Sequence, residues 1–181
     1  MSGIRVHRIS SLDIPQLHPY RTLRRPQEHL KEGIFVAEGE KVVRRFLASD
    51  WPVLSLLLTQ EWYDAILPTV SEDRLEGAEV FIAEKGLLET IVGFPLHQGV
   101  MAVGRVPAER PLEETIPLLP SPHFLVALDG LVHAENVGVV VRNCAGFGVD
   151  AILVSSTSAS PYLRRAVRNS IGGVFTVPVR H

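Results

Sequence analysis

Short apolar runs alternate with amphipathic segments through the first half of the chain. Four of these runs have the length and composition of strands, and they cover residues 34–37, 53–59, 80–83 and 99–106. Residues 40–48 repeat apolar side chains at helical spacing, and residues 84–92 form a second helical segment. Strands that alternate with helices in this way predict a small α/β domain.

A proline-rich segment divides the chain. Residues 107–122 contain Pro107, Pro111, Pro117, Pro120 and Pro122. Proline fixes the backbone angle φ and lacks an N–H donor, so this density predicts a semi-rigid linker. We therefore predict a first domain over residues 1–106, a linker over 107–122 and a second domain over 123–181.

The part after the linker has the pattern of alternating strands and helices. An unbroken apolar run at its start is typical of a parallel strand that is buried on both faces. The predicted strands lie at 124–128, 151–154 and 174–179, with a helix at about 161–171 between the last two. Another helix separates the first two strands.

That earlier helix is predicted to begin at Asn136, a good N-cap residue, and to end at Gly148. One apolar stripe runs along it at helical spacing and comprises Val137, Val140, Val141, Cys144 and Phe147. Arg142 lies on a different face, flanked by the small residues Gly138 and Ala145. The pattern therefore predicts a helix that buries its stripe and leaves an arginine outside.

Bulk composition narrows the class of protein. The chain has 181 residues, of which 46% are hydrophobic and 21% charged, as in globular proteins. No apolar run approaches the roughly 20 residues of a membrane span, and the first residues lack a signal core, so we expect a cytoplasmic protein. The single cysteine, Cys144, and the histidine spacings predict no metal site.

Charge is distributed unevenly, although the net charge is only −2. Residues 1–31 hold six basic and two acidic side chains, residues 151–181 hold four arginines and no acid, and all but three of the 18 basic residues are arginine. Guanidinium groups suit bidentate phosphate contacts. Basic ends therefore favour two localised RNA-contact patches, with Arg21, Arg24 and Arg25 in the first. Ordinary solvated helix faces are the alternative interpretation.

Two motifs in the second domain resemble the SpoU (TrmH-type) branch of the SPOUT RNA methyltransferases. The first is N-x-G-x-x-x-R-x-x-x-x-F-G, from Asn136 to Gly148, and the second is R-x-S-x-G-G-x-x-x-x-P, from Arg168 to Pro178. Upstream, FVAEG at 35–39 and HQGVMAV at 97–103 are similar to that family's amino-terminal RNA-binding domain. The resemblance thus touches most of the chain.

The resemblance implies a fold, an activity and partners. The fold would be α/β: a small, ribosomal-protein-like RNA-binding domain followed by the first part of a SPOUT (trefoil-knot) methyltransferase domain. The activity would be transfer of a methyl group from S-adenosylmethionine to a ribose 2′-hydroxyl of structured RNA. Ribosomal RNA is favoured over transfer RNA by analogy with relatives that carry the extra domain. The family's active site forms at a two-fold interface, so a homodimer is also expected.

The resemblance also assigns roles to residues. Arg142 matches the arginine beside the reacting ribose; because guanidinium stays protonated, we interpret it as a cation that holds phosphate and stabilises the oxyanion, not as a base. Asn136 matches the asparagine that shapes this loop, with helix capping as its alternative role. Arg168 and Ser170 are candidate phosphate contacts at the end of the second helix. His133 and Glu135 are interpreted as solvated loop residues.

The sequence departs from the family pattern at its end. The G-S-E-G-like and N-V-S-V-A-like segments of the family are absent before His181. We therefore expect the cofactor contacts to lie beyond His181 and this chain alone to be inactive. The alternative is a non-catalytic RNA-binding module with a remnant methyltransferase domain. A generic α/β nucleotide-binding protein is a third reading, and the lack of a G-x-G-x-x-G motif disfavours it.

Overall fold

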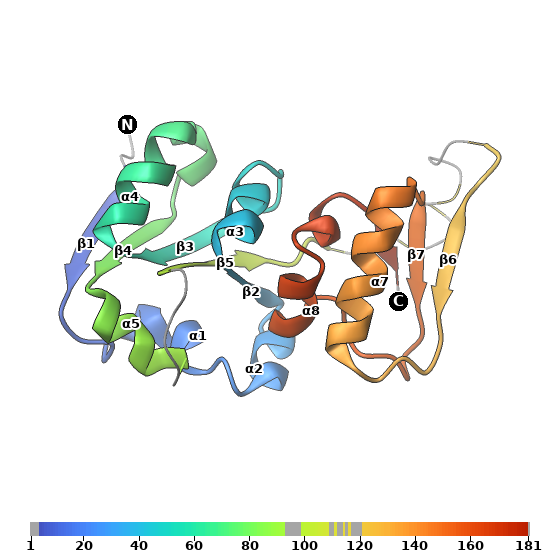
Figure 1. Ribbon diagram of the computed structural model, residues 1–181, viewed down its shortest axis with the longest axis horizontal. Helices are drawn as coiled ribbons and strands as arrows, with labels where there is room; N and C mark the ends of the chain where they lie inside the picture. The colour runs from blue at the N-terminus through green and yellow to red at the C-terminus, as the bar shows by residue number, and fades with distance from the viewer. Residues whose placement is uncertain are drawn as a thin grey trace. The chain divides into compact units, whose positions relative to one another are not determined.

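The computed structural model describes residues 4–92, 99–108, 111, 114, 116 and 121–180. The chain divides into two compact units, Met1–Val106 and Pro107–His181. The division falls at the first residue of the predicted linker. Both units combine strands and helices (Figure 1), so the α/β fold class is confirmed.

The first unit is built on a five-stranded mixed sheet with the order β1-β4-β3-β5-β2. Its strands are β1 (Arg5–Ile9), β2 (Ile34–Glu38), β3 (Val53–Leu58), β4 (Glu79–Ala83) and β5 (Val100–Arg105). Strands β1, β4 and β3 run parallel, whereas β5 is antiparallel to both β3 and β2. The four predicted strands are confirmed. The fifth, β1, escaped prediction because four of its five side chains are exposed and its sequence is largely polar.

Helices cover both faces of this sheet. The described helices are α1 (His18–Arg21), α2 (Pro26–Lys31), α3 (Glu40–Leu47), α4 (Gln60–Ile66) and α5 (Lys85–Val92), with 3-10 turns at Pro15–Leu17, Leu67–Thr69 and Glu72–Leu75. The two predicted helices correspond to α3 and α5. The short helices α1, α2 and α4 were not predicted, because segments of four to seven residues carry too little periodicity to be recognised.

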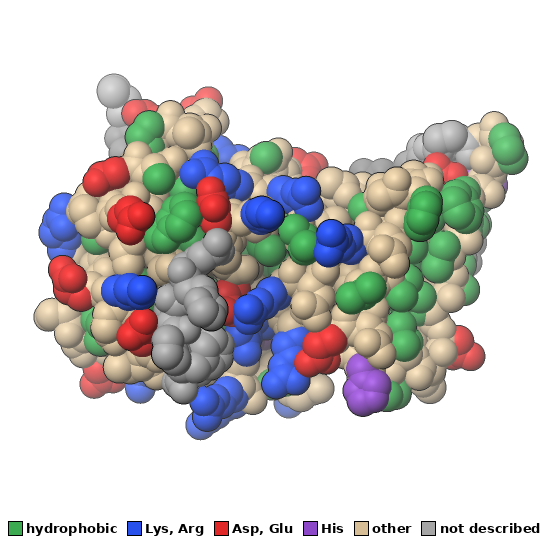
Figure 2. Space-filling model, in the orientation of Figure 1, with side chains coloured by type: hydrophobic (Ala, Val, Ile, Leu, Met, Phe, Trp, Pro, Cys, Tyr) green, Lys and Arg blue, Asp and Glu red, His purple; other side chains and the backbone are tan. Residues whose placement is uncertain are grey.

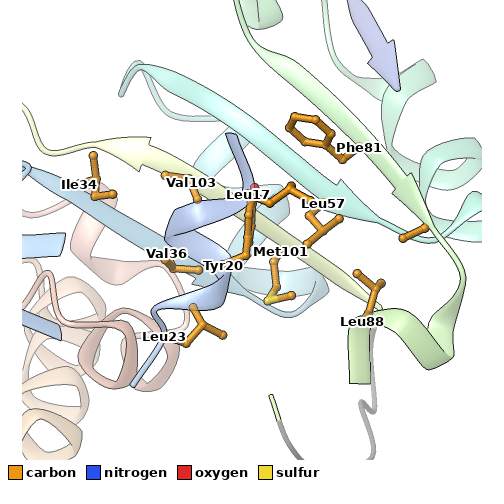
Figure 3. Packing of buried hydrophobic residues seen from close by; sticks show 11 residues of the cluster. Leu17, Tyr20, Leu23, Ile34, Val36, Leu57, Phe81, Leu88, Met101 and Val103 are labelled. Carbon is orange, nitrogen blue, oxygen red and sulfur yellow. The ribbon is translucent and has the colours of Figure 1, made fainter. Parts of the chain in front are cut away.

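The hydrophobic core of the first unit lies between the sheet and these helices. On one face, Tyr20 and Leu23 from the α1 region and Leu88 from α5 pack on the strands (Figure 3). On the opposite face, Phe46 of α3 meets Phe35 of β2 edge to face, with ring centroids 4.9 Å apart. Phe35 and its neighbour Val36 point to opposite faces because side chains alternate along a strand.

In the second unit, the described residues form a parallel sheet with the order β6-β7-β8. The strands are β6 (Leu125–Leu128), β7 (Ala151–Val154) and β8 (Val179–Arg180), and the helices are α7 (Ala134–Phe147) and α8 (Arg164–Asn169), with a 3-10 turn η5 (Gly173–Phe175). Val141 of α7 and Val167 of α8 are fully buried, as is Ile152 of β7. The predicted succession of strand and helix is thus confirmed.

Three predictions about this unit were wrong in detail. Of the strand expected at 174–179, only Val179 is extended in a strand, because Gly172 takes a left-handed conformation with φ at 83° and the turn η5 follows it. The helix expected at about 161–171 extends only over α8. Strand β6 is not buried on both faces: Ala127 is exposed and Phe124 before it is 51% exposed, since β6 is an edge strand of the described sheet.

Candidate active site on helix α7

Helix α7 begins earlier than the sequence predicted. Its N-cap residue is His133, so Asn136 lies within the first turn and does not cap the helix. Gly148 ends the helix in a left-handed conformation, with φ at 70°, as predicted. Asn136 is exposed, and its amide is therefore available to groups outside the helix.

The buried face of α7 includes most of the predicted apolar stripe but not its last residue, Phe147. Val137, Val141 and Cys144 are buried, whereas Phe147 is 76% exposed. Phe147 follows Asn136 by eleven residues, about three helical turns, so both residues fall on the same exposed line. Figure 2 shows hydrophobic side chains at the surface over α7. The exposed face thus combines polar and large apolar groups.

The packing around two glycines, Gly138 and Gly173, explains why the two motifs contain glycine at these positions. A Cβ atom on Gly138 would lie 2.3 Å from the backbone oxygen of Ala166, so only glycine lets α7 approach α8 this closely. A Cβ atom on Gly173 would lie 3.3 Å from the Cα atom of Arg142. The fold therefore joins the two motifs, with the glycine of the second lying against the arginine of the first. Sequence reasoning noted both glycines but missed this packing role.

Arg142 lies at the edge of this junction. Its side chain is exposed, and it has no ion pair or hydrogen bond to any residue that the structure describes. Its backbone is fixed by the buried helix face, by Gly138 one turn earlier and by Gly173 beside it. The guanidinium group is thus an uncommitted cation on a rigid support, which suits a ligand with phosphate or an oxyanion.

A surface ion pair flanks Asn136. Arg165 of α8 donates to Glu135 in the first turn of α7, with a nitrogen–oxygen distance of 2.7 Å. A hydrogen bond from its own backbone N–H, together with Arg165, lowers the pKa of the Glu135 carboxyl group. Glu135 therefore stays ionised and paired, which does not suit a proton-transfer role. It lies in the first turn of α7 and not in a loop, so the prediction of a solvated loop residue was wrong in that respect.

Of the two candidates on the second helix, only Arg168 is exposed. Ser170 is 1% exposed, and its hydroxyl donates to the carbonyl of Val167 at 2.8 Å and accepts from the N–H of Gly172 at 3.2 Å. Ser170 therefore shapes the turn that leads to Gly173, and its burial does not suit the predicted contact with RNA. The sequence could not predict that the Ser170 hydroxyl forms hydrogen bonds inside a turn, because the only local indication is a serine close to a glycine.

The three candidate arginines of the first unit are exposed around α1 and α2. Two of them are paired with carboxylates: Arg21 lies 2.9 Å from Asp13, and Arg25 lies 3.3 Å from Glu28. Arg24 lies between these two along the chain. Exposed pairs of this kind contribute little free energy, so RNA phosphates can displace them.

The upstream motifs have structural roles. Glu38 is buried at the end of β2, and Gly39 takes φ at 90° and donates its N–H to Val100 at 3.1 Å, which starts α3. The motif HQGVMAV lies partly outside the described residues, and its described part, from Gly99 to Val103, leads into β5. Both motifs therefore fix one end of the first sheet.

The described residues give no basis for assigning contacts to a cofactor or metal. The hydroxyl groups after β7 are bonded among themselves: Ser155 lies 2.8 Å from Thr157 and 3.2 Å from Ser158. They do not fit an open set of cofactor ligands, and we assign no cofactor contact to them. Within the described ranges, no group of three or more His, Cys, Asp or Glu side chains could hold a metal, and no helix is long and apolar enough to cross a membrane.

Comparison with known proteins shows what this chain is similar to. The SpoU rRNA Methylase family matches residues 123–181. An uncharacterized tRNA/rRNA methyltransferase of Mycobacterium tuberculosis is 34% identical over 97% of this chain and 60% of its own length. The 23S rRNA (guanosine(2553)-2'-O)-methyltransferase RlmP of Bacillus subtilis is 21% identical over 94% of this chain and 63% of its own length.

Solved structures share the fold. An AdoMet-bound rRNA methyltransferase from Sinorhizobium meliloti superimposes with a TM-score of 0.78 over 97% of this chain and 64% of its own, at 24% identity. The SpoU methyltransferase AviRb from Streptomyces viridochromogenes, in complex with the cofactor AdoMet, gives 0.74 over 92% of this chain and 62% of its own, at 22% identity.

Residues 123–181 match the SpoU rRNA Methylase family, and the resemblance drawn from the two motifs is confirmed. S-adenosylmethionine is a bound cofactor in structures of this fold. The chain spans 60% of the length of the M. tuberculosis relative.

Proposed function

We propose that the protein carrying this chain is an S-adenosylmethionine-dependent RNA methyltransferase that modifies a ribose 2′-hydroxyl, and that its substrate is ribosomal rather than transfer RNA. The observation that carries the proposal is the junction of the two motifs. It places Arg142, uncommitted among the described residues, on the exposed side of α7 against Gly173. The names of similar proteins, among them 23S rRNA 2′-O-methyltransferases, support this choice of substrate and atom.

The proposed role of Arg142 follows from the chemistry of the hydroxyl. A ribose hydroxyl ionises only far above neutral pH, so its reaction needs stabilisation of the developing negative charge on oxygen. Guanidinium remains protonated and can hold the adjacent phosphate while it stabilises that charge. Asn136, exposed on the same helix, would help to orient the ribose. S-adenosylmethionine would supply the methyl group, and its contacts are not assigned to residues of this chain.

A methylation assay tests the proposal. The complete protein would be incubated with labelled S-adenosylmethionine and either ribosomal or transfer RNA, and modified riboses would be mapped by their resistance to alkaline hydrolysis. We expect 2′-O-methylation of ribosomal RNA. Methylation of a base, or of transfer RNA alone, would contradict the proposal. RNA binding without methyl transfer would instead favour the non-catalytic binding module.

We also propose that Arg21, Arg24, Arg25 and Arg168 contact the RNA, and that the protein acts in the cytoplasm.

We further propose that the complete protein is a homodimer through its catalytic domain. The exposed valines and phenylalanine of the second unit support an interface: Val132 is 65% exposed and Val139 is 48% exposed. Sedimentation velocity of the complete protein at micromolar concentration should give the mass of a dimer. A monomer at that concentration would contradict this part of the proposal.

A further inference from the structure

A cavity of about 490 Å³ lies in the first unit, and none of the residues proposed for catalysis lines it. Residues at the ends of three strands line it: Ile9 at the end of β1, Thr59 after β3 and Ala83 at the end of β4. Residues of the helices that follow β3 and β4 also line it. These three strands are parallel, so their carboxyl ends meet at one edge of the sheet. Ligands of open α/β sheets commonly bind at such an edge, and the volume is in the usual range of ligand sites.

Two of the residues that line this cavity each have a buried polar atom that lacks a hydrogen-bond partner among the described residues. These atoms are the hydroxyl oxygen of Thr59 and the side-chain oxygen Oε1 of Gln60. The amide nitrogen of Gln60 is already used, since it donates to Asp64 at 2.8 Å. Buried polar groups are nearly always satisfied, so a ligand with its own donors and acceptors would complete these two.

The rest of the wall indicates what kind of ligand fits. Trp62 of α4 provides an aromatic surface. Arg8 and Lys85 are exposed cations without an ion pair to any described residue, and two exposed carboxylates, Glu61 and Glu84, balance their charge. The aromatic wall and the neutral polar groups suit a planar polar group. The two cations suit one negative charge on the same ligand, whereas the two carboxylates disfavour a polyphosphate.

We propose that this cavity binds one unpaired nucleotide of the RNA substrate. The base lies against Trp62 and forms hydrogen bonds with Thr59 and Gln60, while its phosphate lies near Arg8 and Lys85. Stacking on an aromatic side chain is the usual way in which proteins hold single-stranded bases. This inference rests on the proposed function, because it takes RNA as the ligand. The pocket is a further contact with RNA, in addition to the arginines around α1 and α2.

Fluorescence of Trp62 tests this pocket directly. The chain has two tryptophans, so Trp51→Phe leaves Trp62 as the reporter. In this background the four nucleoside monophosphates are titrated separately. We expect saturable quenching by at least one of them, with an affinity reduced about tenfold by Thr59→Val and by Gln60→Leu, because each loses one hydrogen bond to the base. Lys85→Ala, at an exposed position, should weaken binding and its salt dependence.

Arg5→Ala is the matched control, because Arg5 is also exposed but lies three residues from Arg8, about 10 Å along β1. It should leave the affinity unchanged. No saturable change up to about 10 mM, equal binding by the parent and Thr59→Val, or the same quenching by inorganic phosphate alone would overturn the pocket. The titration involves no methyl transfer, so its failure leaves the proposed enzyme standing, and a failed methylation assay leaves nucleotide binding measurable.

Discussion

Arg142 is the residue on which the proposed chemistry depends most. Its side chain is exposed and unpaired within the described structure, so Arg142→Ala leaves no cavity in the core. We predict that this change lowers the rate of RNA methylation in the complete protein by about 10²- to 10³-fold, as expected for the loss of one preorganised donor. Arg142→Lys should also be slow, because an ammonium group cannot reproduce the planar guanidinium fork.

The matched control for this prediction is Asn143→Ala, which changes the adjacent exposed residue of the same helix. It should retain near-normal turnover. Cofactor titration and thermal unfolding of each variant would separate catalysis from binding and folding. A folded Arg142→Ala protein with normal turnover would remove Arg142 from the mechanism.

We predict that His29 makes the stability of the first unit depend on pH. It is 6% exposed, lies 3.0 Å from the hydroxyl of Thr22, and its burial lowers the pKa of its imidazole below the ordinary 6.5. As the pH falls through 6.5, the unfolded chain binds the proton before the folded one, so the free energy of unfolding should decrease. Urea unfolding at several pH values from about 7.5 to 5.5 would measure this.

The comparison for that measurement is His29→Gln, whose side chain does not titrate. This variant should lose part of the decrease in the free energy of unfolding over the same pH range. Identical pH dependence in the two proteins would show that His29 is not the group responsible.

At the scale of secondary-structure elements, the contact between α7 and α8 is set by Gly138. We predict that Gly138→Ala destabilises the second unit by about 1–3 kcal/mol, because the added Cβ meets the backbone oxygen of Ala166, which cannot move aside as a side chain can. It should also lower methylation activity, since Arg142 follows on the next turn.

Gly146→Ala is the control on the same helix. A Cβ atom there meets nothing within 4 Å, so the change should stabilise the helix by about 0.5–1 kcal/mol. Chemical unfolding of the two variants should therefore shift in opposite directions. Equal stability of Gly138→Ala and the parent would mean that the close approach of the helices is not required.

At the scale of the whole molecule, the first unit has a sheet and a hydrophobic cluster of its own. All five strands of its sheet and the hydrophobic cluster around Tyr20 and Met101 come from residues within Met1–Val106. We predict that a fragment of residues 1–106 folds alone. Cooperative urea unfolding and a near-ultraviolet circular dichroism signal would be the expected result, and a gradual transition without that signal would contradict it.

The sequence by itself predicted most of the longer elements and the resemblance to the SpoU family. Buried strands such as β3 are continuous apolar runs, and α3 has a clear apolar stripe, so local patterns were sufficient to find them. The two motifs could be recognised because their glycines, arginines and serine stand at fixed spacing. The left-handed end of α7 at Gly148 was also predictable from local sequence, because glycine readily takes the left-handed conformation that ends many helices.

Only the tertiary structure decided how those residues are used. Gly138 and Gly173 are required by the approach of one backbone to another, and that approach depends on residues more than 25 positions apart. Ser170 is buried, and its hydroxyl bonds to the turn around it. The cavity beside Trp62 joins residues from three strands that are distant in the chain. Such contacts arise from packing between elements, which periodicity within one element cannot reveal.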